Sequence, residues 1–141
     1  MAWSVFWGVS ELPSAHYRSQ KFAHLALKRV TQLFNDGSVD RDTKSRYQLL
    51  CQSFPVMVRQ SGLIQALAFS AAKGKDETGL GRAHRRILGD VTEILGLGEE
   101  DPVRHVSSAS ALDYVRMTDE VLRAWVYFKR FSKSMLKLEA P

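Results

Sequence analysis

Cysteine is nearly absent from this chain of 141 residues, because Cys51 is its single thiol. One cysteine cannot form an internal disulfide, so a disulfide framework is excluded and a reducing, cytoplasmic location is expected. Long apolar runs are absent too, since no stretch approaches the ~18 apolar residues that a membrane-spanning helix needs. The segment from Met1 to Leu12 has no lysine, no arginine and no long apolar core, so it does not resemble a signal peptide. We therefore expect no membrane partner.

Strand patterns are equally scarce. No convincing run of residues alternates between apolar and polar side chains, as a half-buried strand would. Apolar residues instead recur at spacings of three and four along almost every long segment, which is typical of the buried side of an α-helix. Hydrophobic residues make up 45% of the chain, enough for one core but too few for two. The sequence therefore predicts an all-α fold, with residues 1–141 forming a single-domain bundle of about five to six helices.

Start and stop signals divide the chain into helices. The predicted ranges are about 14–34, 40–54, 55–72, 79–95 and 111–136. Pro55 suits the first position of the third helix, although Ser61 and Gly62 offer another break point. This third helix is apolar on nearly all sides and is expected at the centre of the fold. The acidic stretch from Glu99 to Asp101, beside Pro102, is expected to be an exposed loop.

Aromatic and aliphatic residues on one side of each predicted helix are expected to form the core. They include Tyr17, Phe22, Ala26, Leu33, Phe34, Tyr47, Leu50, Cys51, Phe54, Phe69, Ile87, Val91, Ile94, Tyr114, Met117, Val121, Trp125, Phe128 and Met135. Cys51 is then a small core residue rather than a nucleophile, because buried thiols are common and no histidine is near it in sequence.

Catalytic patterns are missing. No phosphate-binding GxxxxGK[ST] loop is present, and Gly79 and Gly81 lack the rest of a nucleotide fingerprint. The four histidines, His16, His24, His84 and His105, have none of the spacings of a zinc or nuclease site. Asp90 follows Arg86 by four residues, so an ordinary ion pair within one helix explains that carboxylate. We expect no catalytic residue, no metal site, no cofactor and no enzymatic activity.

Basic residues are the stronger signal. The formal net charge is +5 and the sequence pI about 9.6, which makes a polyanionic partner plausible. Arg82, Arg85 and Arg86 lie near the start of a predicted helix, where positive charge is mildly unfavourable, so contact with RNA or with an acidic partner is a candidate role. The same group of arginines is expected on the outer side of its helix.

The last helix carries a second basic group. Arg116, Arg123 and Arg130 recur every seven residues, together with Lys137, on the side opposite its apolar stripe. Lys129, Lys133 and Lys137 also suit the negative end of the helix dipole, so helix stability alone accounts for them.

Two further features leave alternatives open. Arg59 is the one charged residue between Val56 and Phe69, so it either forms a buried ion pair or reaches solvent and contacts a phosphate. Residues 1–13 contain Trp3, Phe6 and Trp7, which either fold back on the core or form a docking segment for a neighbouring subunit.

Two stretches resemble a known family. From Tyr47 the chain reads Tyr-Gln-Leu-Leu-Cys-Gln-Ser-Phe-Pro-Val-Met-Val-Arg-Gln-Ser-Gly-Leu-Ile-Gln-Ala-Leu-Ala-Phe, ending at Phe69. From Tyr114 it reads Tyr-Val-Arg-Met-Thr-Asp-Glu-Val-Leu-Arg-Ala-Trp-Val-Tyr-Phe-Lys-Arg-Phe, ending at Phe131. The stretch from Tyr47 is similar to the signature of the small helical subunit of Cmr (type III-B) CRISPR effectors. The stretch from Tyr114 resembles the closing helix of the same family.

The resemblance implies a non-catalytic subunit in prokaryotic antiviral defence. Several copies would stack along a ribonucleoprotein, contact the subunits that carry crRNA, and help to hold single-stranded target RNA through its backbone while other subunits cut. No catalytic residue carries over, and the RNA contacts rest on charge alone, with Arg59, Arg82, Arg85, Arg86, Arg116, Arg123 and Arg130 as candidates. The main rival is a free-standing helical module whose basic faces meet acidic proteins, and a weaker one is a DNA-binding helical protein.

Overall fold

The computed structural model describes the backbone of residues 14–139 and the side chains of residues 17–135. Over this range the chain forms helices joined by short turns, without a strand. The helices are α2 (Ser14–Phe34), α3 (Arg41–Ser61), α4 (Leu63–Lys73), α5 (Gly79–Leu95), α6 (Pro102–Ser107) and α7 (Ala111–Glu139). None of the described helices is long and apolar enough to cross a membrane. The predicted all-α, single-domain class is confirmed for the part of the chain that is described.

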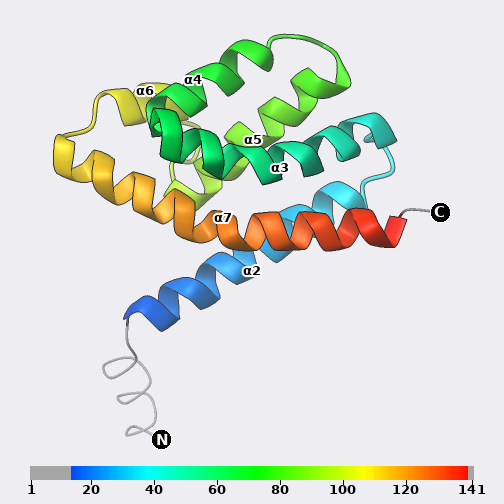
Figure 1. The fold of residues 1–141 in the computed structure, drawn as a ribbon, viewed down its shortest axis with the longest axis horizontal. Coiled ribbons are helices and arrows are strands. Elements are labelled where there is room, and N and C mark those ends of the chain that lie inside the picture. The colour runs from blue at the N-terminus through cyan, green and yellow to red at the C-terminus, as the bar shows by residue number, and fades with distance from the viewer. Residues whose placement is uncertain (1–13, 140–141) are drawn as a thin grey trace, which may run out of the picture.

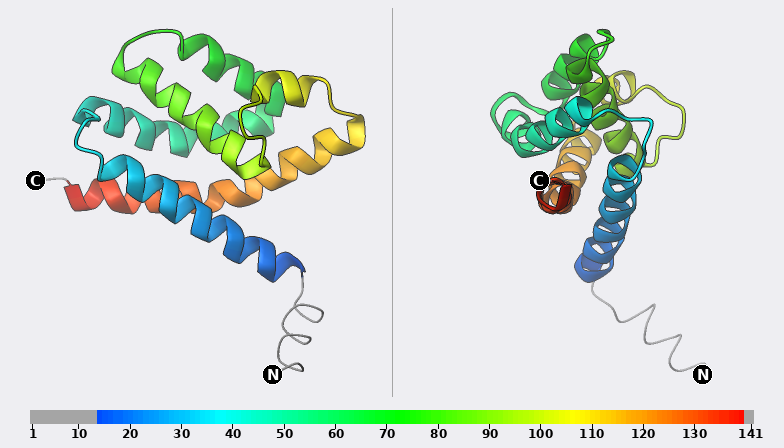
Figure 2. Two further views of the ribbon diagram at one scale, coloured as in Figure 1. Left: turned by 180° about the vertical axis from the view of Figure 1, so that it is seen from behind. Right: turned by 90° about the vertical axis from the view of Figure 1, so that its right-hand side faces the viewer.

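The long helix α7 organises the bundle. It runs across the molecule, with α2 crossing it on one side and α3 packed above it (Figure 1). The reverse view shows the crossing of α2 and α7 directly, with α5 lying above it (Figure 2). Beyond α3 the shorter helices α4 and α6 complete the upper layer. The predicted limits of α2 and α5 are confirmed to the residue.

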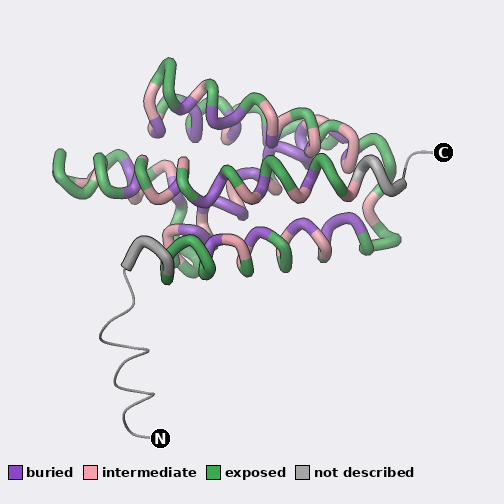
Figure 3. The backbone as a smooth tube through the Cα atoms, turned by 60° about the horizontal axis from the view of Figure 1, so that its bottom comes forward, coloured by how far each residue is buried: buried purple, intermediate pink, exposed green. Residues whose placement is uncertain are grey.

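Helix α2 packs on α7 through a stripe of apolar side chains. Phe22, Ala26, Val30 and Leu33 are buried at spacings of four, four and three, which places them on one side of the helix. The buried positions of α2 and α7 lie on the sides that face other helices (Figure 3). Tyr17 was expected in this stripe but is 62% exposed, because the first turns of α2 project beyond the other helices (Figure 1).

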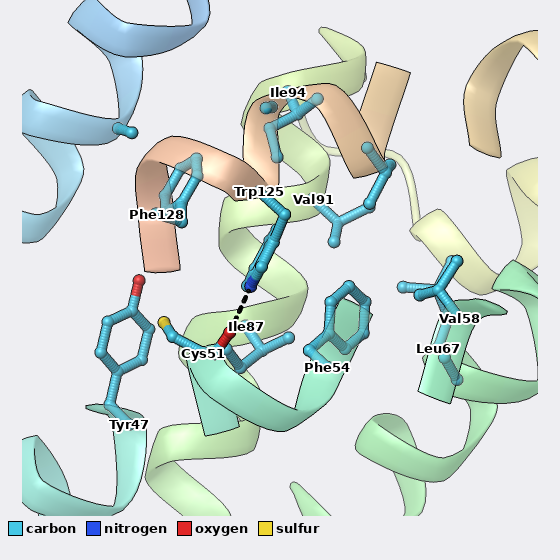
Figure 4. Close-up of a cluster of buried hydrophobic side chains, with 14 of the residues drawn as sticks. Tyr47, Cys51, Phe54, Val58, Leu67, Ile87, Val91, Ile94, Trp125 and Phe128 are labelled. Atoms are coloured by element: carbon cyan, nitrogen blue, oxygen red, sulfur yellow. Dashed lines mark hydrogen bonds between the residues drawn. The ribbon is translucent and has the colours of Figure 1, made fainter. Parts of the chain in front are cut away.

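The centre of the core lies between α3, α5 and α7. On α3 it contains Tyr47, Cys51 and Phe54, and on α7 it contains Trp125 and Phe128 (Figure 4). The Trp125 ring lies 4.6 Å from the ring of Phe54 and is stacked 4.9 Å from the ring of Phe128, centroid to centroid. Full burial of side chains of this size stabilises a fold by roughly 1.5–3 kcal/mol each.

The helix start predicted at Pro55 is wrong, because α3 continues through Pro55 to Ser61. Proline has no N–H, so Pro55 leaves the carbonyl of Cys51, four residues earlier, without its usual partner. The indole nitrogen of Trp125 donates to that carbonyl at 3.0 Å. The chain breaks instead at Gly62, whose φ of 91° is open to glycine but strained for other residues.

Helix α4 lies at the surface of the bundle rather than at its centre. Leu63, Ala66, Leu67 and Ser70 are buried on one side of it. Phe69 was expected in the core but is 42% exposed, since it lies at the edge of this stripe. Its ring meets the imidazole of His84 edge-on, with centroids 5.7 Å apart.

Helix α6 occupies part of the segment expected to be a loop. Pro102 takes its first turn, where the missing N–H costs nothing, and the carboxylate of Asp101 accepts a hydrogen bond from the N–H of Val103 at 3.0 Å. Pro102 and Val106 are buried. The acidic residues Glu99 to Asp101 remain exposed, as predicted.

Candidate nucleic-acid interface

A groove runs between α3 and α7 and has a volume of about 390 Å³. It is lined by Gln52, Pro55 and Arg59 of α3 and by Leu122, Trp125, Val126, Lys129, Arg130 and Lys133 of α7. The two helices pack through Phe54 and Trp125 beneath it, so the side chains above that contact form its walls. A buried contact therefore sets the separation of the two charged walls.

The walls of the groove are cationic. Arg59 extends from α3, and Lys129, Arg130 and Lys133 extend from little more than one turn of α7. All four residues are exposed, and no ion pair or hydrogen bond joins their side chains to a described residue. Among the described residues, none that lines the groove is acidic. Four unpaired cations so placed attract an anion that can span both helices.

The floor of the groove is mainly apolar, with Pro55, Leu122 and Val126 contributing to it. Val126 is 48% exposed, whereas Trp125 at the base is only 1% exposed. Gln52 adds the one neutral polar side chain of the lining, and its amide nitrogen donates to the main-chain oxygen of Lys129 at 3.3 Å.

Of the two alternatives for Arg59, the structure excludes a buried ion pair with a described residue. This side chain reaches solvent at the rim of the groove. Arg130 lines the same groove from α7. Lys129 and Lys133 were assigned to helix stability from the sequence, so their place in the groove was missed. Their spacing around Arg130 was visible in the sequence, but nothing there indicated that Arg59 comes from another helix to join them.

Arg82 and Arg85 are outward but already paired. Arg82 donates to the main-chain oxygen of Glu77 at 2.8 Å and forms an ion pair of 3.3 Å with Asp40. Arg85 donates to the carbonyls of Gly74 and Asp76. These bonds hold the turn between α4 and α5 and tie it to the start of α3. The cluster preferred from the sequence is therefore less available to a ligand than the α3–α7 groove.

Arg86 does not face outward as expected. Its guanidinium donates to the carbonyl of Arg29 at 2.7 Å, and its Nε is buried without a hydrogen-bond partner among the described residues. Asp90, expected to form an ordinary ion pair with Arg86, lies 3.8 Å from that Nε and bonds more closely elsewhere. The helical spacing of Arg86 and Asp90 was correct, but both side chains turn into the bundle.

Asp90 is the centre of a buried polar network. It is fully buried, pairs with Nε of Arg29 at 2.8 Å and accepts a hydrogen bond of 2.5 Å from the hydroxyl of Tyr47. Burial raises the pKa of Asp90, although the charge of Arg29 and the Tyr47 hydroxyl act in the opposite direction. Burial, followed by the Asp90 charge, raises the pKa of Tyr47. The network ties α2 and α3 to α5, and the sequence did not indicate it.

The basic stripe on α7 divides into two parts. Arg116 lies 3.8 Å from Asp113, and Arg123 lies 2.8 Å from Asp119, each within α7. Arg130 lies in the groove and has no such partner. The side chain of Lys137 lies outside the described range, as do Trp3, Phe6 and Trp7. The seven-residue repeat therefore does not act as one continuous surface.

Metal ligands do not cluster in the described part of the chain. Over that part no cluster of histidine, cysteine, aspartate and glutamate side chains could hold a metal ion. His84 is buried, and its Nδ1 lies 3.1 Å from the hydroxyl oxygen of Ser70. Cys51 is fully buried, and burial raises the pKa of its thiol. Gly81 makes room for the carbonyl of Asp76, which a Cβ would overlap, so this glycine has a packing role.

The fold and the groove define a small, basic, all-helical protein with an open cationic groove. A family model described as CRISPR-associated protein (Cas_Cmr5) matches residues 18–135. The CRISPR system Cmr subunit Cmr5 of Thermus thermophilus is 32% identical over 121 residues, which cover 85% of this chain and 96% of the relative. The chain belongs to the Cmr5 family of CRISPR-associated proteins.

A solved structure agrees with this assignment. The crystal structure of a CRISPR-associated Cmr5 family protein from Thermus thermophilus is similar with a TM-score of 0.68 and 34% sequence identity. The match covers 84% of this chain and 96% of that chain. The resemblance to a small Cmr subunit, inferred from the stretches that begin at Tyr47 and Tyr114, is confirmed.

Proposed function

We propose that this chain is the small, non-catalytic subunit of a type III-B Cmr effector in a prokaryotic cytoplasm, where its α3–α7 groove helps to hold target RNA. The observation that carries the RNA role is the set of four unpaired cations on the two walls of the groove. Membership in the Cmr5 family supports the subunit role over a free-standing helical module. The antiviral role follows from the same membership.

The groove suits the backbone of a single strand. Arg59 and Arg130 come from different helices, so a phosphodiester chain between them is contacted from both sides. Such contacts release counterions and depend on salt, and they read no base directly. Each copy offers few contacts, so binding by one isolated subunit is expected to be weak. Several copies stacked along the effector, beside the subunits that carry crRNA, add their contacts along one RNA.

The RNA role can be tested in a reconstituted Cmr complex that contains this chain. The Arg59→Glu and Arg130→Glu double variant is expected to bind target RNA more weakly and with a lower salt dependence, because each lost phosphate contact reduces the slope by about 0.7 for a single strand. The matched control is Arg116→Glu with Arg123→Glu, which makes the same charge change on paired residues of α7. Equilibrium binding over a salt series measures the affinity and the salt dependence of both variants.

If the groove variant assembles and binds target RNA with the affinity and salt slope of the unmodified complex, the groove does not hold RNA. A loss of equal size in the control would show a general charge effect. The Arg82 to Arg86 cluster is tested by Arg82→Gln with Arg85→Gln, which is expected to destabilise the α4–α5 turn more than it weakens RNA binding.

The aromatic segment at residues 1–13 belongs to the proposed subunit role as a docking element. Trp3, Phe6 and Trp7 are large apolar anchors of the kind that concentrate binding energy at protein interfaces. Replacing all three by alanine is expected to reduce incorporation into the complex while leaving the helical content of the isolated chain unchanged. Full incorporation, measured by native mass spectrometry, would exclude the docking role.

A further inference from the structure

The α3–α7 groove has a feature that phosphate binding does not explain. Beneath its cationic walls lies an apolar floor in which Val126 is 48% exposed and Pro55 and Leu122 line the same hollow. The N–H of Trp125 is bonded to the carbonyl of Cys51, so the base of the groove offers no donor from this ring. Phosphates are hydrated anions and gain nothing from an apolar floor. A ligand that fits the whole groove has an apolar face as well as negative charge.

We propose that the groove takes one unstacked nucleobase of a single-stranded RNA, with the base against Leu122 and Val126 and the flanking phosphates between Arg59 and Arg130. This inference rests on the proposed function and adds a second kind of contact to it. The face of every base is largely apolar, so covering it with the aliphatic floor removes apolar surface from water. A single nucleotide with its flanking phosphates can therefore contact the apolar floor through its base and the cationic walls through its phosphates.

The size and polarity of the groove agree with this occupant. A volume of about 390 Å³ lies at the lower end of the roughly 300–1,000 Å³ typical of small-molecule sites. Bases in a duplex are stacked on their neighbours, so a duplex cannot place one on the floor without unstacking it. Gln52 is the one neutral polar group in the lining, and its amide oxygen makes no hydrogen bond to a described residue. Sequence preference is therefore expected to be weak.

The test separates the base from the phosphates. The purified full chain is titrated at low salt with fluorescent oligouridine, and in parallel with an abasic oligonucleotide of equal length and phosphate count. We expect oligouridine to bind about tenfold more tightly, because burying one face of a base against an aliphatic floor contributes on that order. Val126→Asn makes the floor polar at nearly the same side-chain size, without changing its charge or adding an aromatic ring, and it is expected to bind both oligonucleotides with nearly equal affinity and an unchanged salt slope.

The control variant is Val115→Asn, on the same side of α7 but roughly three turns earlier. Val115 is 62% exposed and does not line the groove, so this variant is expected to keep the preference for oligouridine. Thermal melts establish that both variants are folded.

Each outcome bears on one of the two proposals. Equal binding of both oligonucleotides by the unmodified chain would overturn base insertion but leave phosphate holding intact. A preference for oligouridine that survives Val126→Asn would place the base elsewhere and overturn the inference. Competition by polyglutamate as strong as that by unlabelled oligouridine at equal charge concentration would show that negative charge alone accounts for binding and would overturn base insertion. The RNA role itself fails separately, through unchanged target binding by the Arg59 and Arg130 variant in the complex.

Discussion

The indole nitrogen of Trp125 donates a hydrogen bond to the main-chain oxygen of Cys51, at the one turn of α3 where Pro55 offers no N–H (Figure 4). An unpaired buried carbonyl is costly, so this bond allows proline to remain inside a helix. It also orients the tryptophan that forms the base of the groove. The same contact therefore serves the core and the candidate site.

Trp125→Phe is expected to destabilise the protein by about 1–3 kcal/mol, because it leaves the Cys51 carbonyl buried and unpaired. In a Pro55→Ala background the cost should be smaller, since alanine supplies the missing N–H within the helix. Urea unfolding of the two single variants and the double variant measures the coupling. Effects that add within about 0.5 kcal/mol would mean that the two residues are independent.

Asp90→Ala is expected to cost about 3–5 kcal/mol, because it leaves the guanidinium of Arg29 partly buried without its partner. The control is Glu93→Ala on the same helix, an exposed position that should change stability by no more than about 0.5 kcal/mol. Chemical unfolding of both variants gives the comparison. Similar stability of the two would contradict a structural role for the Tyr47–Asp90–Arg29 network.

Gly62→Ala is expected to destabilise by about 1–3 kcal/mol, since a side chain is strained at positive φ. The added Cβ would also lie 3.0 Å from the hydroxyl of Tyr114, which accepts the N–H of Ile64 at the start of α4. Gly37→Ala is the matched control, because a Cβ there meets nothing within 4 Å. Thermal melts that rank the two substitutions in the opposite order would refute this account.

Phe69→Ala is expected to cost well below the about 3–5 kcal/mol expected for Trp125→Ala. Both were expected to be core aromatics from the sequence, but Phe69 is 42% exposed and Trp125 only 1%. Equal losses in urea unfolding would show that Phe69 is more deeply packed than the structure indicates.

The stability of the protein is expected to depend on pH through the buried side chain of His84. Burial lowers its pKa below the ordinary 6.5, and the charge of Lys73 acts in the same direction. The unfolded chain therefore binds a proton at this residue more readily than the folded chain, so stability falls as the pH decreases below 6.5. His84→Gln keeps a polar partner for Ser70 and removes this titration. As the pH is lowered, the stability of the unmodified protein should fall more than that of the variant. Melting temperatures that change with pH in parallel for the two proteins would exclude the effect.

Local patterns were sufficient for much of the fold. The limits of α2 and α5 depend on nearby signals, namely the stop at Asn35 to Gly37 and the start at Gly79, and both were predicted correctly. The break between α3 and α4 at Gly62 was predicted only as the alternative to a helix start at Pro55, because a proline that favours a helix start by itself lies inside α3, where a tryptophan 70 residues later bonds the carbonyl that it leaves free. The exposure of Phe69 was misjudged for a similar reason, since periodicity gives the side of a helix but not what covers it.

The sequence by itself determined the helical class, the basic balance and the resemblance to the Cmr5 family, because composition, periodicity and motif are all properties of the chain read in order. The tertiary structure alone decided which cations are free. Hydrogen-bond acceptors within the bundle bind three of the arginines, Arg82, Arg85 and Arg86. Four other cations line the α3–α7 groove instead, namely Arg59, Lys129, Arg130 and Lys133. Pairing depends on distances between helices that are far apart in sequence, and packing of the core sets those distances.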